Sequence, residues 1–169
     1  FIKITDYADE LLSSLEELDW PENVKLMQKN WIGKSFGAEI EYKIDASKDS
    51  LITFSTRPDT IFGVSFLAIS PNHPLAIKIA KDNEKISNFL EKCKEAKAAE
   101  ADMARAEKLG IDTNLRVIHP LTGDKLPVWI GNFVLLDYGT GVVMGVPAHD
   151  SRDYEFAKKY NLNIKEVIQ

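Results

Sequence analysis

The most constraining feature of this sequence is a change of pattern near residue 38, where short alternating segments replace helical periodicity. In Ala38–Ile44 apolar residues alternate with polar ones, the pattern of a strand with one buried face. Five further strand-like segments follow: Leu51–Thr56, Val64–Ile69, Leu115–Ile118, Leu126–Leu136 and Gly141–Val146. Several are joined by hairpin turns, and a repeating strand–helix–strand pattern is absent. The expected fold class is therefore mixed α/β, with a mostly antiparallel or mixed sheet that is barrel-like and carries inserted helices.

Helical periodicity precedes the first strand. Asp6–Leu18 has apolar residues at three- and four-residue spacing, and Pro21 can open a second short helix because its missing N–H costs nothing there. We therefore expect residues 1–34 to form a helical lead and residues 35–169 to form the main domain.

Two later stretches are also helical in composition. Leu75–Leu109 is expected to be helical, with a break near residues 82–83 and with Gly110 as the C-cap. The last helix is expected over Asp150–Tyr160, after a proline that ends the preceding strand.

Composition excludes several classes of protein. No apolar run approaches the roughly 18 residues that span a bilayer, and residues 1–5 lack the features of a secretory signal. The single cysteine, Cys93, rules out an internal disulfide and a multi-cysteine zinc site. The net charge is −5, whereas a dedicated nucleic-acid binder usually carries a surplus of positive charge. If the domain meets RNA, we expect contact at one end of the strand, with most of the affinity supplied by another part of a larger protein.

The segment Thr53–Thr60 is denser in polar and charged residues than packing requires. Hydroxyls, one arginine and one carboxylate crowd the end of the expected second strand, where Pro58 restricts the backbone. The simplest interpretation is a β-turn with Pro58 at its second position and Thr60 as a cap. A polar binding site is the alternative, and the local sequence leaves both open.

Residues 138–153 form a second segment of this kind. Gly139, Gly141 and Gly145 suggest a dinucleotide-binding loop, but their spacing is one residue too long. These glycines also precede a strand rather than opening a helix, as phosphate binding would need. We expect instead a strand that ends at Pro147 and delivers backbone and apolar side chains to a pocket beside a helix N-terminus.

Two aspartates stand at this helix N-terminus. Asp150 is a natural N-cap, and Asp153 falls in the first turn, where the helix dipole favours a carboxylate. Either aspartate can therefore be purely structural, and Asp150 is the stronger candidate for that role. His149 could be a general base or a ligand, but the sequence shows no metal-ligand spacing. No nucleophile elbow, phosphate-binding loop or catalytic dyad is visible.

The two polar segments resemble the motifs of a known family. Ser55–Gly63 is similar to the threonine-rich motif of class I synthetase editing domains, and its Arg-Pro-Asp-Thr core resembles the leucine enzyme. Gly139–Gly141 followed by Val146–Ala157 resembles the second motif of that enzyme, and Asn30–Ser35 and His119–Gly123 agree as well. The chain is thus identified as a member of the bacterial-type leucyl-tRNA synthetase family, covering its inserted editing domain. The ATP-binding signatures of the synthetic core are absent from this sequence.

The resemblance implies an aminoacyl-tRNA ester hydrolase that acts on the aminoacylated 3′ end of leucine tRNA. Asp153 would hold the substrate ammonium and Thr56 would help to place the attacking water, so these are the expected catalytic residues. Thr60 would exclude leucine while admitting isoleucine, valine or norvaline. The other residues implied for substrate binding are Ser55, Arg57, Tyr138, Met144, Val146, His149 and Asp150. Position 55 is serine where the family often has threonine, and the hydroxyl is kept.

The resemblance also implies a context for the domain. The remainder of the synthetase would be its partner in a cytoplasmic protein without membrane contact, and the inserted domain is expected to continue beyond Gln169. Editing itself would need no metal and no cofactor, because ATP and magnesium serve only the synthetic core. Alternatives are a catalytically inert tRNA-binding module of the same fold, the editing domain of an isoleucine or valine enzyme, and a free-standing deacylase.

Overall fold

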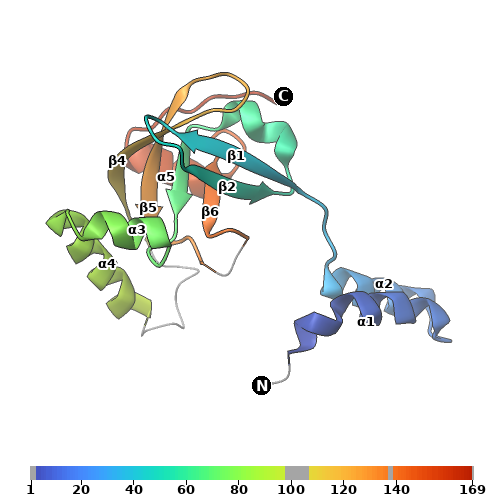
Figure 1. Cartoon of the computed structure of the whole chain (residues 1–169). Helices are drawn as coiled ribbons and strands as arrows, with labels where there is room; N and C mark the ends of the chain where they lie inside the picture. Colours follow the sequence, from blue (N-terminus) through green and yellow to red (C-terminus); the bar gives the residue numbers. More distant parts are fainter. Residues whose placement is uncertain (1–2, 98–106, 137–138, 169) are drawn as a thin grey trace. The chain divides into compact units, whose positions relative to one another are not determined.

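The structure is a computed structural model that describes residues 3–97, 107–136 and 139–168. The chain divides into two compact units, Phe1–Phe36 and Gly37–Gln169. Figure 1 shows that the first unit is helical and that the second is built around a sheet.

The first unit contains two helices flanked by short 3-10 turns. Its elements are η1 (Ile4–Tyr7), α1 (Ala8–Ser14), η2 (Leu15–Glu17) and α2 (Glu22–Ile32). The segment predicted as one helix is therefore helical, but 3-10 turns form both of its ends. Ion pairs between Lys34 and Asp9 (2.8 Å) and between Lys29 and Glu16 link α2 and its C-terminal end to the preceding helical segment. The second helix is capped by Gly33, whose φ of 66° is the left-handed conformation that glycine adopts without a steric penalty.

The second unit is built around a six-stranded sheet with the strand order β2-β1-β4-β5-β3-β6. The strands are β1 (Ala38–Ile44), β2 (Ser50–Ser55), β3 (Phe66–Ile69), β4 (Gly110–Ile118), β5 (Lys125–Gly131) and β6 (Val142–Gly145). Neighbouring strands are antiparallel, except that β3 and β5 are parallel. The predicted mixed α/β class with a mostly antiparallel sheet is thus confirmed.

The two edge strands of this sheet, β2 and β6, contact each other. The hydroxyl of Thr140, just before β6, donates a hydrogen bond to the carbonyl of Ile52 in β2. A Cβ on Gly139 would lie 3.5 Å from the Cβ of Phe54, so the loop before β6 lies against β2. Within the described residues no strand ladder joins the two edges, so the sheet is barrel-like without being a closed barrel.

The strands β3 and β5 are buried on both faces, which explains their nearly continuous apolar sequences. Leu67 and Val128 face the main core, whereas Phe66 and Trp129 face a second cluster. Helix α5 (Ser151–Lys159) covers this second cluster with Phe156, whose ring meets Trp129 edge-on at a centroid distance of 5.5 Å. This packing fixes the position of the helix that follows β6.

The helical stretch after β3 is broken where the sequence predicts it. Helices α3 (Pro74–Ala80) and α4 (Glu84–Lys97) are separated by residues 81–83, and their apolar sides pack into the main core. His73 caps α3, because its Nδ1 accepts the N–H of Leu75 at 3.2 Å.

The predicted end of this helical stretch is wrong. Residues 98–106 lie outside the described residues, Leu109 is not helical, and Gly110 begins β4 instead of capping a helix. A Cβ at Gly110 would lie 2.6 Å from the Phe156 ring, so this glycine is needed for a close approach between a strand and α5. The strand β4 therefore begins five residues before the predicted Leu115.

The strand predicted to run as far as Leu136 is too long. It ends at Gly131, and the chain then turns, with the N–H of Val134 donating to the carbonyl of Gly131 at 3.2 Å. Val134 is buried in the second cluster. Val134 is apolar because this turn packs into the protein interior. Judged by periodicity alone, the sequence of such a turn resembles that of a strand.

Candidate active site

Strand pairing brings the two polar segments together. The 3-10 helix η3 (Pro58–Gly63) leads into β3, and β6 leads into the turn before α5. Because β3 and β6 are antiparallel, the start of one lies beside the end of the other, with Phe66 opposite Gly145. The N–H of Ser65 also donates to the carbonyl of Gly145 at 3.0 Å. The end of η3 therefore lies beside the turn between β6 and α5, and a Cβ on Gly63 would lie 3.5 Å from the His149 ring.

The predicted turn with Pro58 at its second position is present, since the N–H of Thr60 donates to the carbonyl of Arg57 at 3.2 Å, and this turn continues into the 3-10 helix η3. Pro58 occupies its first turn, where the missing N–H costs nothing. The Oγ of Ser55 accepts the N–H of Arg57 at 3.0 Å, and the hydroxyl of Thr60 donates to the Arg57 carbonyl at 2.8 Å. Thr60 is 3% exposed, whereas Thr56 is exposed. The hydroxyls of Ser55 and Thr60 thus order the segment, and the Thr56 side chain remains open to solvent.

Arg57 and Asp59 form an exposed ion pair within this segment. Nη2 of Arg57 lies 2.7 Å from Oδ2 of Asp59, and Nε lies 3.0 Å from Oδ1, so the pair is bidentate. The hydrogen bond from Arg57 holds the pKa of the Asp59 carboxyl below its usual value. Such an exposed pair contributes little to stability, but it fixes the orientation of the guanidinium group.

Asp150 is the N-cap of α5. Its backbone is extended, and its Oδ1 accepts the N–H groups of Arg152 at 2.7 Å and Asp153 at 3.2 Å. Burial tends to raise the pKa of Asp150, but these two N–H groups and the Arg152 guanidinium outweigh it, so the net direction is down. The capping role considered for both aspartates therefore belongs to Asp150.

Removing this cap is expected to destabilise the protein. In Asp150→Ala the two N–H groups lose their acceptor and the helix dipole loses a nearby negative charge, which should lower the free energy of unfolding by about 1–2 kcal/mol. Asp150→Asn keeps an acceptor oxygen and should lose less. Urea unfolding of the three proteins measures the difference, and equal stability of Asp150→Ala and the native protein would contradict the capping assignment.

Asp153 points back toward the end of β6 instead of capping the helix. Its Oδ2 accepts the N–H of Val146 at 2.9 Å, and the residue is half-buried. Burial raises the pKa of Asp153 from 3.8 to about 6, and the Asp150 charge adds to this. The Val146 N–H, Arg152 and Lys108 act in the opposite direction without cancelling it. Within the described residues Oδ1 has no hydrogen-bond donor, so one oxygen of this poorly solvated carboxylate is available to a cation.

The raised pKa of Asp153 predicts a pH-dependent stability. Its folded-state pKa lies above the unfolded value, so protonation favours the folded state, and this contribution is complete below pH ~4 and lost as the pH rises through ~6. The pKa difference of about 2 corresponds to at most about 3 kcal/mol. We therefore expect Asp153→Asn to be more stable than the native protein at pH 7.5 and similar to it at pH 4. Urea unfolding at both pH values tests this; an equal difference at both would contradict it.

Of the remaining residues predicted for the site, Met144 lies on β6, and Val146 and His149 follow it. Val146 is buried, and Met144 accepts a weak hydrogen bond at its Sδ from the Tyr42 hydroxyl at 3.8 Å. The Nε2 of His149 accepts the N–H of Val167 at 3.1 Å, so this nitrogen is occupied and does not support the general-base alternative. His149 also lies near Asp59, but the pKa of that carboxyl is lowered chiefly by the hydrogen bond from Arg57. Tyr138 lies outside the described residues.

His119 is a residue of this region to which the sequence assigned no role. It follows β4, is 2% exposed, and its Nε2 lies 2.9 Å from the carbonyl of Ile61 in η3. Its ring meets Tyr42 edge-on and stacks on Phe62. The stretch beginning at His119 resembled the family, but no spacing in the sequence shows that this side chain reaches a residue 58 positions earlier.

Other features of the described residues do not extend the site. A hollow of about 490 Å³ beside the end of α5 is lined by Ala157, Lys158 and residues 161–164, none of which belongs to the predicted site. No cluster of three or more His, Cys, Asp or Glu side chains suited to a metal ion occurs in residues 3–97, 107–136 and 139–168. In the same residues no helix has both the length and the apolar character needed to cross a membrane. The candidate site is therefore defined by η3, the end of β6 and the start of α5.

Comparison with known proteins places this arrangement in a family. Residues 29–169 match the family described as leucyl-tRNA synthetase, editing domain. The chain is also similar to the LeuRS of Agrobacterium radiobacter K84, solved as a ternary complex with tRNA and LeuAMS, at 35% identity and a TM-score of 0.80. That match covers 99% of this chain but only 20% of the Agrobacterium protein. The resemblance found in the sequence motifs is confirmed, and the chain belongs to the leucyl-tRNA synthetase editing-domain family.

Proposed function

We propose that this chain hydrolyses the ester bond of mischarged leucine tRNA in a site that rejects leucine. The observation that supports this most strongly is the place of Asp153. A half-buried carboxylate with one uncommitted oxygen lies at the start of α5, where the second motif adjoins the segment carrying Thr60.

Asp153 binds the α-ammonium group of the esterified amino acid. Its Val146 hydrogen bond fixes the carboxylate plane and leaves Oδ1 for the ligand. Burial makes the ionised form costly while the site is empty, so an arriving cation relieves that cost and strengthens the pair. This interaction places the ester carbonyl rather than reacting with it.

Water carries out the attack in this proposal. The Thr56 side chain is exposed next to the ordered Ser55–Arg57 turn, so its hydroxyl is free to hold the water and the terminal ribose. Rate enhancement then rests on orientation and on stabilisation of the oxyanion, with assistance from a substrate ribose hydroxyl. Arg57, fixed by Asp59, contributes positive charge at the rim of this site.

Thr60 supplies the selectivity. A hydrophobic pocket separates amino acids that differ by one methyl group by only about 1–3 kcal/mol, so a synthetase needs a second site that excludes the correct product. Thr60 is buried, and its hydroxyl is bonded to the Arg57 carbonyl, which fixes the direction of its methyl group. We propose that this methyl group collides with leucine and leaves room for isoleucine, valine or norvaline.

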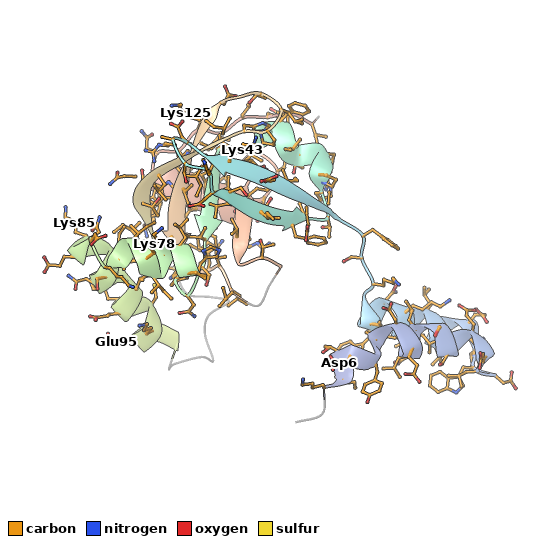
Figure 2. The ribbon with its side chains drawn as sticks, in the orientation of Figure 1. Asp6, Lys43, Lys78, Lys85, Glu95 and Lys125 are labelled. Atoms are coloured by element: carbon orange, nitrogen blue, oxygen red, sulfur yellow. The ribbon has the colours of Figure 1, made fainter. Side chains whose placement is uncertain are left out.

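Most of the affinity for tRNA comes from elsewhere in the protein. Figure 2 shows Lys43, Lys78, Lys85 and Lys125 distributed over separate elements of the second unit, and the net charge is −5. The first unit exposes large apolar side chains, including Trp31 at 87% and Phe36 at 84%. Exposed apolar side chains in such number favour a protein partner, and we propose that the rest of a synthetase is that partner.

Deacylation of isoleucyl-, norvalyl- and threonyl-tRNA tests the proposal. We expect release of isoleucine and norvaline from leucine tRNA, measured in single turnovers with excess protein so that weak tRNA affinity is not limiting. Binding without release of any amino acid would favour the inert module. Preferential release of threonine from valine tRNA, or of valine from isoleucine tRNA, would favour the editing domain of another synthetase.

A further inference from the structure

His119 is held by more contacts than a turn histidine requires. Its Nδ1 accepts the N–H groups of Leu121 at 3.2 Å and Thr122 at 3.1 Å, which closes the turn between β4 and β5. With Nδ1 acting as an acceptor, the ring proton lies on Nε2, and Nε2–H donates to the Ile61 carbonyl at 2.9 Å. The ring therefore connects the β4–β5 turn to η3.

The two residues that His119 contacts in η3 directly follow Thr60. Ile61 supplies the carbonyl, which also accepts the N–H of Val64 at 3.2 Å within η3. Phe62 stacks on the His119 ring at a centroid distance of 6.3 Å and an interplanar angle of 24°. Thr60 therefore bonds through its own hydroxyl to the Arg57 carbonyl, and the next two residues in the chain are anchored by His119.

We propose that His119 is a positioning residue that sets the discrimination against leucine. The inference rests on the proposed function, because it assigns to His119 the placement of the Thr60 methyl group. Exclusion by one methyl group depends on its position to within about 0.5 Å, and a short 3-10 helix has few bonds of its own to maintain that position. The hydrogen bond from His119, in the turn between β4 and β5, to the Ile61 carbonyl supplies a further constraint on the position of η3.

Two substitutions of His119 test the hydrogen bonds of its two ring nitrogens separately. In H119N the amide oxygen can replace Nδ1 as acceptor for the turn, but the side chain is too short to reach Ile61. In H119Q the amide nitrogen can replace Nε2 as donor to the Ile61 carbonyl. We expect H119N to raise the ratio of leucyl- to isoleucyl-tRNA hydrolysis about 3- to 10-fold, the effect of one lost hydrogen bond, and H119Q to raise it much less.

His73 provides the matched control. It also precedes a proline and its Nδ1 also accepts an N–H two residues later, but α3 lies outside the site. H73N should therefore leave the ratio as it is in the native protein. If H119N unfolds at the assay temperature, Phe62→Ala at a 48% exposed position tests the same anchoring and should shift the ratio in the same direction.

The outcomes distinguish this inference from the proposed function. A higher ratio in H119N than in H119Q and H73N supports the positioning role. If the native protein hydrolyses isoleucyl-tRNA but H119N keeps the native ratio, or H119Q relaxes it as much as H119N does, the role of His119 is overturned and the proposed function stands. If the native protein hydrolyses no mischarged leucine tRNA, the proposed function fails first.

Discussion

Asp153→Asn is expected to slow the hydrolysis of isoleucyl-tRNA by about 100- to 1,000-fold, because the substrate ammonium loses its charged partner in a poorly solvated position. The substitution is nearly isosteric. The amide oxygen can still accept the Val146 N–H that now bonds to Oδ2, so the end of β6 should keep its position. Single-turnover deacylation with saturating protein measures the effect on the chemical step.

Stability measurements separate this loss from misfolding. Asp153→Asn should be at least as stable as the native protein at pH 7.5, since it removes a carboxylate whose pKa burial has raised to about 6. Glu155→Gln is the matched control: it changes an exposed carboxylate on the same helix, 3.5 Å from Lys108, and should retain activity. If Asp153→Asn is inactive only because it is unfolded, Asp153 is a structural residue and its assignment to the ammonium group is wrong.

Thr60→Ala is expected to make the protein hydrolyse correctly charged leucyl-tRNA. Removing the methyl group opens space for the branched end of leucine, so hydrolysis of leucyl-tRNA should rise about 10- to 100-fold. The change also deletes the bond from the Thr60 hydroxyl to the Arg57 carbonyl, so two further variants are needed to separate size from hydrogen bonding. Thr60→Val keeps the shape without the hydroxyl, and Thr60→Ser keeps the hydroxyl without the methyl group.

The steric account makes opposite predictions for these two variants. Thr60→Val should still reject leucine, and Thr60→Ser should accept it in part. Isoleucyl-tRNA hydrolysis in each variant reports whether the site remains intact. Acceptance of leucine by Thr60→Val together with rejection by Thr60→Ser would show that the hydroxyl, and not the methyl group, excludes leucine.

Local patterns in the sequence predicted the order of the elements and the polar segments. The alternation of apolar and polar residues located β1, and the N-cap residue Asp150 marked the start of α5. Both signals depend only on residues that are neighbours in the sequence. Gly110 was assigned to the wrong element. A side chain at this position would collide with the ring of Phe156, which lies 46 positions later in the chain, so glycine is needed for packing and not for a helix cap. Val134 was assigned to a strand because buried apolar residues in a turn have no characteristic spacing that distinguishes them from those of a strand.

The site itself depends on long-range pairing. The sequence does not show that β3 lies beside β6, and this pairing alone brings the end of η3 next to the turn before α5. The sequence favoured Asp150 as the N-cap but left a structural role open for Asp153 as well, and only the structure shows that the Asp153 carboxylate bonds to the N–H of Val146. The link from His119 to Ile61 was missed for the same reason: the two residues meet only through the packing of a hairpin against η3.

The most direct test of the account is the ratio of single-turnover hydrolysis rates for isoleucyl- and leucyl-tRNA on the same leucine tRNA. The native protein should release isoleucine at least about 100 times faster than leucine, because Thr60 blocks the leucine side chain, whereas isoleucine fits the site with its ammonium group held by Asp153. Equal rates for the two substrates, or no release of either, would contradict a hydrolytic site that excludes leucine.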